Sequence, residues 1–260
     1  MTRTILLLLA VCAVPLPVAA SDDGGRGLEI ARESERRYDD YADQRGEAVL
    51  TIRTADGDEA VRRMHARSLN TDDGSRNLTV VDAPKDVAGT ALLTHSYDER
   101  PDEQWLLLPA LNRVKRIAAG NRSGAFMGSE FTYEDFTAQP VAKFDFRFLR
   151  EAELDGQPCY VLERTPKKAE NSAYARHVAW LDRAHYRTLK VEYYNRAGQH
   201  QKTLRATDFK AYDNGQWRPG KLTMTNHLGG GTSVLEWSGI EFGNGFTERD
   251  FSVDALKRAR

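Results

Sequence analysis

Apolar and polar residues alternate along most of this chain. From Glu47 onward, short runs with a period of two residues are separated by turn residues, for example Ala55-Asp56-Gly57-Asp58. A period of two is typical of β-strands with one buried face, and clusters of Gly, Asp and Asn mark the turns between them. We predict strands over residues 47–53, 61–69, 77–81, 91–97, 104–108, 113–118, 142–150, 158–164, 175–182, 188–194, 201–209, 217–226 and 232–242.

Residues 28–41 follow a different period. Leu28, Ile30, Ala31, Ser34 and Tyr38 fall on or near one face among charged neighbours, which predicts an N-terminal helix. One helix and about a dozen strands favour a mainly-β fold, in which an antiparallel sheet meanders or curves into an incomplete barrel.

One face of the predicted sheet is apolar and needs a cover. Its clearest members are two sets of alternating side chains, Phe144, Phe146 and Phe148, then Leu189, Val191 and Tyr193. Burying one such side chain contributes roughly 1.5–3 kcal/mol, so an uncovered row would be a liability in water. A single helix covers only part of this face. Either the barrel is filled by its own side chains or a ligand occupies a cavity, and the pattern leaves both open.

The last predicted strand changes its apolar side partway along. Leu235 and Trp237 share one parity, whereas Ile240 and Phe242 share the other. Ser238-Gly239 lies between the two pairs, where one extra residue would produce the change. We therefore predict a β-bulge there that bends the sheet.

The N-terminus has the pattern of an export signal. Arg3 precedes an apolar run over residues 5–14, and Val18-Ala19-Ala20 offers small residues for cleavage. An apolar run of about ten residues is too short to cross a bilayer. We predict a signal peptide at residues 1–20 and one continuous domain at 21–260, with Cys159 as its single cysteine and no internal disulfide.

Composition and motifs argue against several functions. The chain has 37 Lys and Arg against 38 Asp and Glu, which disfavours a nucleic-acid partner. The six histidines are scattered, without metal-ligand spacing, and no nucleophile elbow or P-loop occurs. Glu134 and Asp135 are interpreted as solvated turn acids, and His177 as a surface or structural residue. We predict no catalytic residue, no metal and no cofactor.

Residues 113–122 carry cations on both sides of a predicted strand. Arg113 and Lys115 share one face, while Arg116 stands on the other, and Arg122 follows in the next loop. These cations could contact a lipid headgroup or a protein partner, or they could protect a solvated edge strand from aggregation.

The loop over residues 120–128 holds Phe126 and Met127 between glycines. It is either a mobile lid over a cavity mouth or an ordinary loop with a buried apolar residue.

Residues 104–109 (QWLLLP) and 112–136 (NRVKRIAAGNRSGAFMGSEFTYEDF) resemble the outer-membrane lipoprotein-sorting proteins, periplasmic relatives of the LolA and LolB lipid carriers. The resemblance implies a curved, incomplete β-barrel whose concave face accepts acyl chains, with the N-terminal helix at that face. It implies no enzymatic activity. Proteins of this kind often accompany exporters of the RND superfamily, which makes such an exporter a possible partner.

The sequence thus predicts a monomeric periplasmic carrier that binds a lipid or lipoprotein acyl chain and contacts membranes transiently. The alternative is a docking module of an envelope transport complex that binds no lipid. Candidate cavity residues are Trp105, Leu107, Phe126, Met127, Phe144, Phe146, Phe148, Leu189, Val191 and Tyr193. Candidate headgroup or partner contacts are Arg113, Lys115, Arg116 and Arg122.

Overall fold

The computed structural model describes residues 23–111, 113–168 and 172–259. The predicted signal peptide at 1–20 lies outside these residues. The first half of the described chain forms α1 (Asp23–Tyr38), β1 (Asp43–Arg53), β2 (Glu59–Thr71), β3 (Gly74–Ala83), β4 (Ala91–Tyr97), β5 (Glu103–Leu108) and β6 (Arg113–Ile117).

The second half forms β7 (Phe144–Leu154), β8 (Gln157–Pro166), β9 (Arg176–Asp182), β10 (Thr188–Tyr194), β11 (His200–Thr207), β12 (Lys210–Ala211), β13 (Trp217–Arg218), β14 (Lys221–Asn226), β15 (Thr232–Phe242) and α2 (Val253–Arg258). Every predicted strand is confirmed. The segment predicted as one strand over 217–226 is divided at Pro219-Gly220, because proline has no N–H to donate to a ladder.

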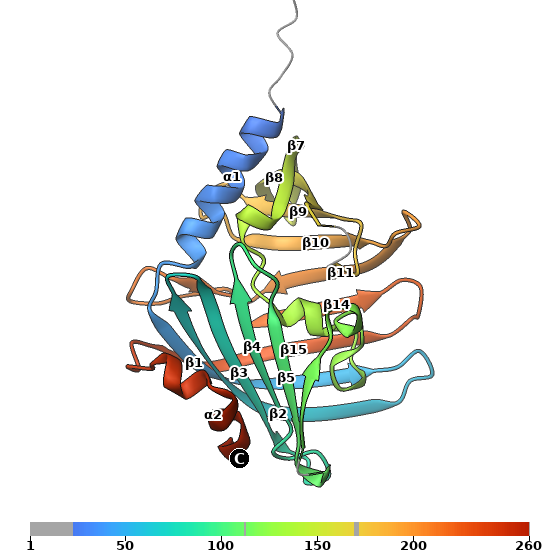
Figure 1. Cartoon of the computed structure of the whole chain (residues 1–260). Helices are drawn as coiled ribbons and strands as arrows, with labels where there is room; N and C mark the ends of the chain where they lie inside the picture. The colour runs from blue at the N-terminus through green and yellow to red at the C-terminus, as the bar shows by residue number, and fades with distance from the viewer. Residues whose placement is uncertain (1–22, 112, 169–171, 260) are drawn as a thin grey trace, which may run out of the picture.

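The strands form a 13-stranded sheet in the order β6-β5-β4-β3-β2-β1-β15-β14-β11-β10-β9-β8-β7, and the small β12–β13 pair stands apart. All of its pairings are antiparallel. Two meanders, β1–β6 and β7–β15, meet where β1 pairs with β15. The sheet curves but does not close, so the predicted mainly-β, incomplete barrel is confirmed (Figure 1).

Helix α1 lies across β7 at one edge of the sheet (Figure 1). Its residues Ile30 and Ala31 are buried against Phe148 of β7 and Leu162 of β8. The contact is close at Gly27, where an added Cβ would lie 2.7 Å from the backbone nitrogen of Phe148. The predicted helix is therefore present, although it begins at Asp23 and ends at Tyr38.

The predicted bulge in β15 is confirmed. Arg45 pairs with Glu241 and Glu47 pairs with Ser238, so β15 has one residue more than β1 over this stretch. Gly239 takes a φ of 58°, a left-handed conformation that glycine adopts without a steric penalty. Because of the extra residue, Ile240 points to the same face as Leu235 and Trp237. All three side chains face the concave side.

The segment that connects the two edge strands, residues 118–143, crosses the concave side of the sheet. We call it the edge linker. Its Phe126 is 1% exposed and belongs to a core cluster with Leu50, Met224 and Leu235. The backbone N–H of Glu130 donates to the Ser233 hydroxyl of β15. In Figure 1 the edge linker is the green segment that lies in front of β14 and β15.

The convex side is covered by the C-terminal segment, a role that the alternation pattern does not predict. Phe251 and Leu256 are fully buried against Leu78, Leu93 and Leu107. Strand β4 is consequently buried on both faces. This explains its nearly continuous apolar sequence, because a strand with two covered faces does not alternate.

Asp43 fixes the start of this C-terminal segment. Its buried carboxylate accepts hydrogen bonds from the backbone of Asn244 (2.7 Å), Gly245 (2.9 Å) and Phe246 (3.2 Å). Burial opposes ionisation of Asp43, but these bonds and that from the Asn244 side chain hold its pKa below the usual range.

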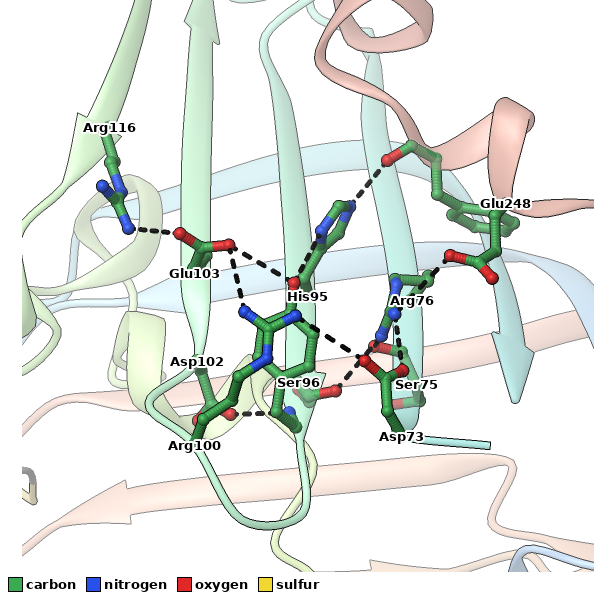
Figure 2. A network of polar contacts seen from close by, with 12 residues as sticks. Asp73, Ser75, Arg76, His95, Ser96, Arg100, Asp102, Glu103, Arg116 and Glu248 are labelled. Carbon is green, nitrogen blue, oxygen red and sulfur yellow. Dashed lines mark hydrogen bonds and ion pairs between the residues drawn. The ribbon is translucent and has the colours of Figure 1, made fainter. Parts of the chain in front are cut away.

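A polar network ties the same segment to β3–β6 (Figure 2). An imidazole nitrogen of His95 lies 2.7 Å from the carbonyl oxygen of Phe251, and Arg76 pairs with Asp73 at 2.6 Å. Glu103 pairs with Arg116, which links the edge strand β6 into the network. None of the helices in the described ranges is long and apolar enough to cross a membrane.

Gly27→Ala is expected to destabilise the fold by about 1–2 kcal/mol. The methyl group would meet the β7 backbone, and overpacking of this kind outweighs the gain in helix propensity. Urea unfolding followed by tryptophan fluorescence measures the change. Gly24→Ala is the matched control, since Gly24 is exposed in the same helix and should be neutral or slightly stabilising. Equal midpoints for both variants would contradict the close contact.

Asp43→Ala is expected to lower the free energy of unfolding by about 2–3 kcal/mol, because it removes a charged acceptor from several N–H donors at once. Protease cleavage in residues 243–259 should accelerate in parallel. Asp86→Ala, at an exposed carboxylate, should stay within about 0.5 kcal/mol of the unchanged protein. A similar small effect for Asp43→Ala would argue that the segment is held by its apolar contacts alone.

Candidate functional site

The concave side of the sheet contains a cavity of about 1190 Å³. Sheet strands form its wall, the C-terminal half of α1 borders it, and the edge linker covers one end. The part of the wall that β8–β15 form is apolar and consists of alternate residues of these strands, namely Leu162, Ala179, Leu181, Val191, Leu204, Ala206, Leu222, Leu235, Trp237 and Ile240. The part that β1–β4 form is more polar and includes Gln44, Ser68, Asn77 and Ser96. The curvature of the sheet directs this face inward, so the cavity follows from the alternation seen in the sequence.

The mouth of the cavity lies at the opposite end from the edge linker's phenylalanines. It is formed by residues 34–41 at the end of α1, the β9–β10 turn at 185–188 and residues 214–219. Several of its side chains are charged, including Glu35, Asp39 and Arg218. The cavity therefore passes from a polar rim to an apolar wall.

The floor of the cavity is polar again. Cross-strand pairing aligns five residues of neighbouring strands, so their side chains share the concave face: Arg164, His177, Tyr193, Lys202 and Asn226. We call these residues the polar row. The next row toward the mouth is apolar, as Leu162 pairs with Ala179, Ala179 with Val191 and Val191 with Leu204.

Two members of the polar row line the cavity, Arg164 and Tyr193, and Arg164 is the charged one. Its Nε donates to Nδ1 of His177 at 3.3 Å, and its guanidinium lies 4.6 Å from the centre of the Phe144 ring. His177 is buried, and burial together with the neighbouring Arg164 charge holds its pKa well below the usual range. His177 is therefore a neutral acceptor that orients Arg164.

The edge linker contributes two acids above the polar row. Asp135 accepts from the backbone and hydroxyl of Thr132 at 2.7 and 2.9 Å, and from the Tyr174 hydroxyl. Glu134 accepts from the Ser172 hydroxyl at 2.5 Å and the Ala173 backbone at 2.6 Å. Burial raises the pKa of both carboxyls. The prediction of solvated turn acids is wrong here, because the linker folds inward and not along the surface.

Three of the predicted cavity residues line the cavity, Phe146, Val191 and Tyr193. Phe144 shares their face but is covered by Arg164, and Phe148 lies under α1, where Arg26 stacks on it at 3.8 Å. The helix and one arginine therefore occupy part of the face that the sequence offered to a ligand.

Trp105, Leu107 and Leu189 lie outside the cavity, and the structure corrects their expected place. Trp105 and Leu107 face the convex side, beneath the C-terminal segment. Leu189 packs with Trp180 on the outer face because the β9–β10 pairing shifts between Thr188 and Lys190, which removes Leu189 from the parity of Val191. Period-two alternation distinguishes two faces but does not say which one is concave.

Phe126 and Met127 lie beneath the cavity and not at its mouth. Phe126 is buried in the core cluster, and Met127 packs on the same cluster with a φ of 52°. Of the two interpretations of this loop, the buried apolar residue is the one that the structure contains.

The four predicted cationic contacts have separate environments. Arg113 and Lys115 are exposed on the edge strand β6, where neither forms an ion pair within the described residues. Arg116 pairs with Glu103 (Figure 2). Arg122 is buried and pairs with Asp102 at 3.4 Å, a carboxylate that Lys143 also contacts at 2.6 Å. Arg122 therefore holds the edge linker and does not face the cavity.

Arg164 and Lys202 are functional candidates that were not predicted from the sequence. A signal was present, since Arg164 shares its parity with Leu162, and Lys202 shares its parity with Leu204 and Ala206. A cation in register with apolar residues marks a charge on the apolar face. Across the ranges that the structure describes, no three His, Cys, Asp or Glu side chains gather as metal ligands. The arrangement favours the binding of an amphiphile.

Comparison with known proteins agrees with the fold. A family model described as an uncharacterized protein matches residues 73–258. A proposed outer-membrane lipoprotein-sorting protein domain from Vibrio parahaemolyticus is 43% identical, with a TM-score of 0.88 and coverage of 90% of this chain and 100% of its own. A DUF1329 family protein from Desulfovibrio piger is 30% identical, with a TM-score of 0.87 and coverage of 91% and 100%.

A LolA superfamily protein from Nitrosomonas europaea shares the fold at 19% identity, with a TM-score of 0.71 and coverage of 88% and 98%. A comparison with curated proteins gave no match. These likenesses confirm the resemblance that residues 104–136 indicated.

His177→Gln is expected to flatten the acid side of the stability profile. The unfolded chain binds a proton at His177 near pH 6.5, whereas the folded chain does so only at much lower pH. Stability is therefore lost as pH falls below about 6.5, by at most about 1.4 kcal/mol per pH unit. Glutamine cannot take up this proton. Urea unfolding at both pH values tests the difference, and parallel pH dependence in the two proteins would contradict a neutral buried His177.

Proposed function

We propose a carrier function for this chain, which belongs to the DUF1329 family and has the fold of the LolA superfamily: it binds the acyl chain of a lipid in the cavity and moves it between the membranes of the envelope. The observation that carries the proposal is the cavity itself. Its volume of about 1190 Å³ exceeds what a packed protein interior leaves empty, and the wall that β8–β15 form is apolar. Such a wall needs an apolar occupant to be kept from water.

The location and the partner belong to the same proposal. The lipoprotein-sorting relative and the LolA fold support a periplasmic carrier of lipid or lipoprotein. The export-signal pattern at residues 1–20 supports the same compartment. We propose an exporter of the RND superfamily as the membrane partner, on the resemblance of residues 104–136. The cations Arg113 and Lys115 on the open edge strand are the candidate contacts with a partner or a headgroup.

Ala206→Phe is expected to reduce lipid occupancy by about tenfold or more. Ala206 is a buried residue of the cavity wall, and a phenyl ring there would take the space of the acyl chain. Native mass spectrometry of the protein purified from its own envelope measures the occupancy, and solvent extraction identifies the lipid released.

Ala197→Phe is the matched control, because Ala197 is exposed in the β10–β11 turn outside the cavity lining. It should keep the occupancy of the unchanged protein. Equal occupancy in both variants would show that the lipid does not bind in this cavity. A protein that carries no lipid and takes none up from envelope-lipid vesicles would instead favour the docking module without cargo.

A further inference from the structure

We propose that the cargo is a free single-chain lipid with an anionic headgroup, that it enters the cavity headgroup first, and that Arg164 at the floor binds the headgroup. This inference rests on the proposed carrier function and names its ligand class. It reverses the orientation in which a lipid attached to a protein would enter, since a protein moiety has to remain outside the mouth.

The first support is that Arg164 has no anionic partner among the residues that the structure describes. It forms no ion pair within the described ranges, and its side-chain hydrogen bond there is the one from Nε to His177. The two terminal nitrogens of the guanidinium have no hydrogen-bond partner in the same ranges, and the side chain lines the cavity. A guanidinium is always charged and presents a planar fork that matches a carboxylate or a phosphate.

The second support is that Arg164 is held in place. His177 accepts its Nε–H, and the Phe144 ring supports the guanidinium plane. Rings of Tyr174, Tyr193 and Phe144 surround His177, with centroid distances of 5.2, 5.0 and 6.0 Å. A donor that is already oriented loses little conformational entropy when it binds an anion.

The nearby acids do not replace a ligand. Asp135 and Glu134 are close enough to stabilise the charge on Arg164, but neither forms an ion pair with it. Their oxygens are occupied by Thr132 and Tyr174 in one case, and by Ser172 and Ala173 in the other. Lys202 is similarly occupied, because its Nζ donates to the Glu130 carbonyl at 2.6 Å. Among the described residues at the floor, Arg164 is left as the cation with free donors.

The polarity along the cavity fits this orientation. From His177 at the floor to Leu181 near the mouth, β9 rises about 13 Å, and the wall that β8–β15 form over that length is apolar. The edge linker closes the floor through Phe131 and Phe136, so a ligand enters from the mouth. A headgroup bound to Arg164 therefore leaves the acyl chain along the apolar wall.

The test compares three probes that share a sixteen-carbon chain and differ in headgroup: hexadecanoic acid, hexadecyl phosphate and hexadecan-1-ol. Dissociation constants are measured by titration calorimetry at pH 8. An anionic probe should bind the unchanged protein roughly 10- to 100-fold more tightly than the alcohol, the range for one or two charge-assisted hydrogen bonds. The tighter of the two anionic probes identifies the headgroup as a carboxylate or a phosphate.

Arg164→Met should remove this preference and leave the affinity for hexadecan-1-ol within about threefold, because methionine keeps the apolar stem without the charge. Arg164→Lys should retain part of it. Arg147→Met is the matched control, since Arg147 pairs with Glu163 at 2.9 Å and is 60% exposed on β7. It should behave like the unchanged protein.

Three outcomes separate the inference from the carrier proposal. A preference for an anion that depends on Arg164 supports both. Equal affinity of the unchanged protein for acid, phosphate and alcohol overturns the headgroup role and keeps the carrier. No binding of any probe overturns both. The comparison of headgroups uses the unchanged protein, so a folding defect in Arg164→Met would not prevent a decision.

Discussion

The structure depends on one constraint, that a curved sheet with an apolar concave face cannot remain open to water. Closing the barrel would satisfy it, but β6 and β7 stay apart as free edges. The edge linker between them provides a partial solution, as it folds inward and buries Phe126 against Leu50 and Leu235. What the linker does not fill remains as the cavity. The cavity is therefore the part of the concave face that the edge linker leaves uncovered.

The convex face is covered by a second element that comes from the far end of the chain. Asp43 accepts hydrogen bonds from residues 244–246, and Phe251 and Leu256 then reach the outer side of β3–β5. The network in Figure 2 joins the same segment to the edge strand β6 through His95, Glu103 and Arg116. Strand β4 thus has two covered faces, with Leu92 in the concave core cluster and Leu93 beneath the C-terminal segment.

Inside the cavity, charge and apolar surface alternate along a single direction. The rim carries charges that water can reach, the wall that β8–β15 form is apolar, and the floor returns to polar groups at Arg164 and Tyr193. Burying a cation is costly unless the site offers it partners, and here the partners are a neutral imidazole, an aromatic ring and acids at longer range. An anionic headgroup would supply the missing direct partner.

The sequence alone determined the strands, the N-terminal helix and the bulge at Ser238-Gly239, because these follow from local alternation and turn chemistry. It also identified an apolar face that needs a cover. Tertiary structure decided which face is concave, and so placed Trp105 and Leu107 under the C-terminal segment and Val191 in the cavity. It also decided the roles of Arg164 and Asp135. These roles depend on which strands become neighbours and on where the edge linker folds, and both are set by contacts between residues far apart in the chain.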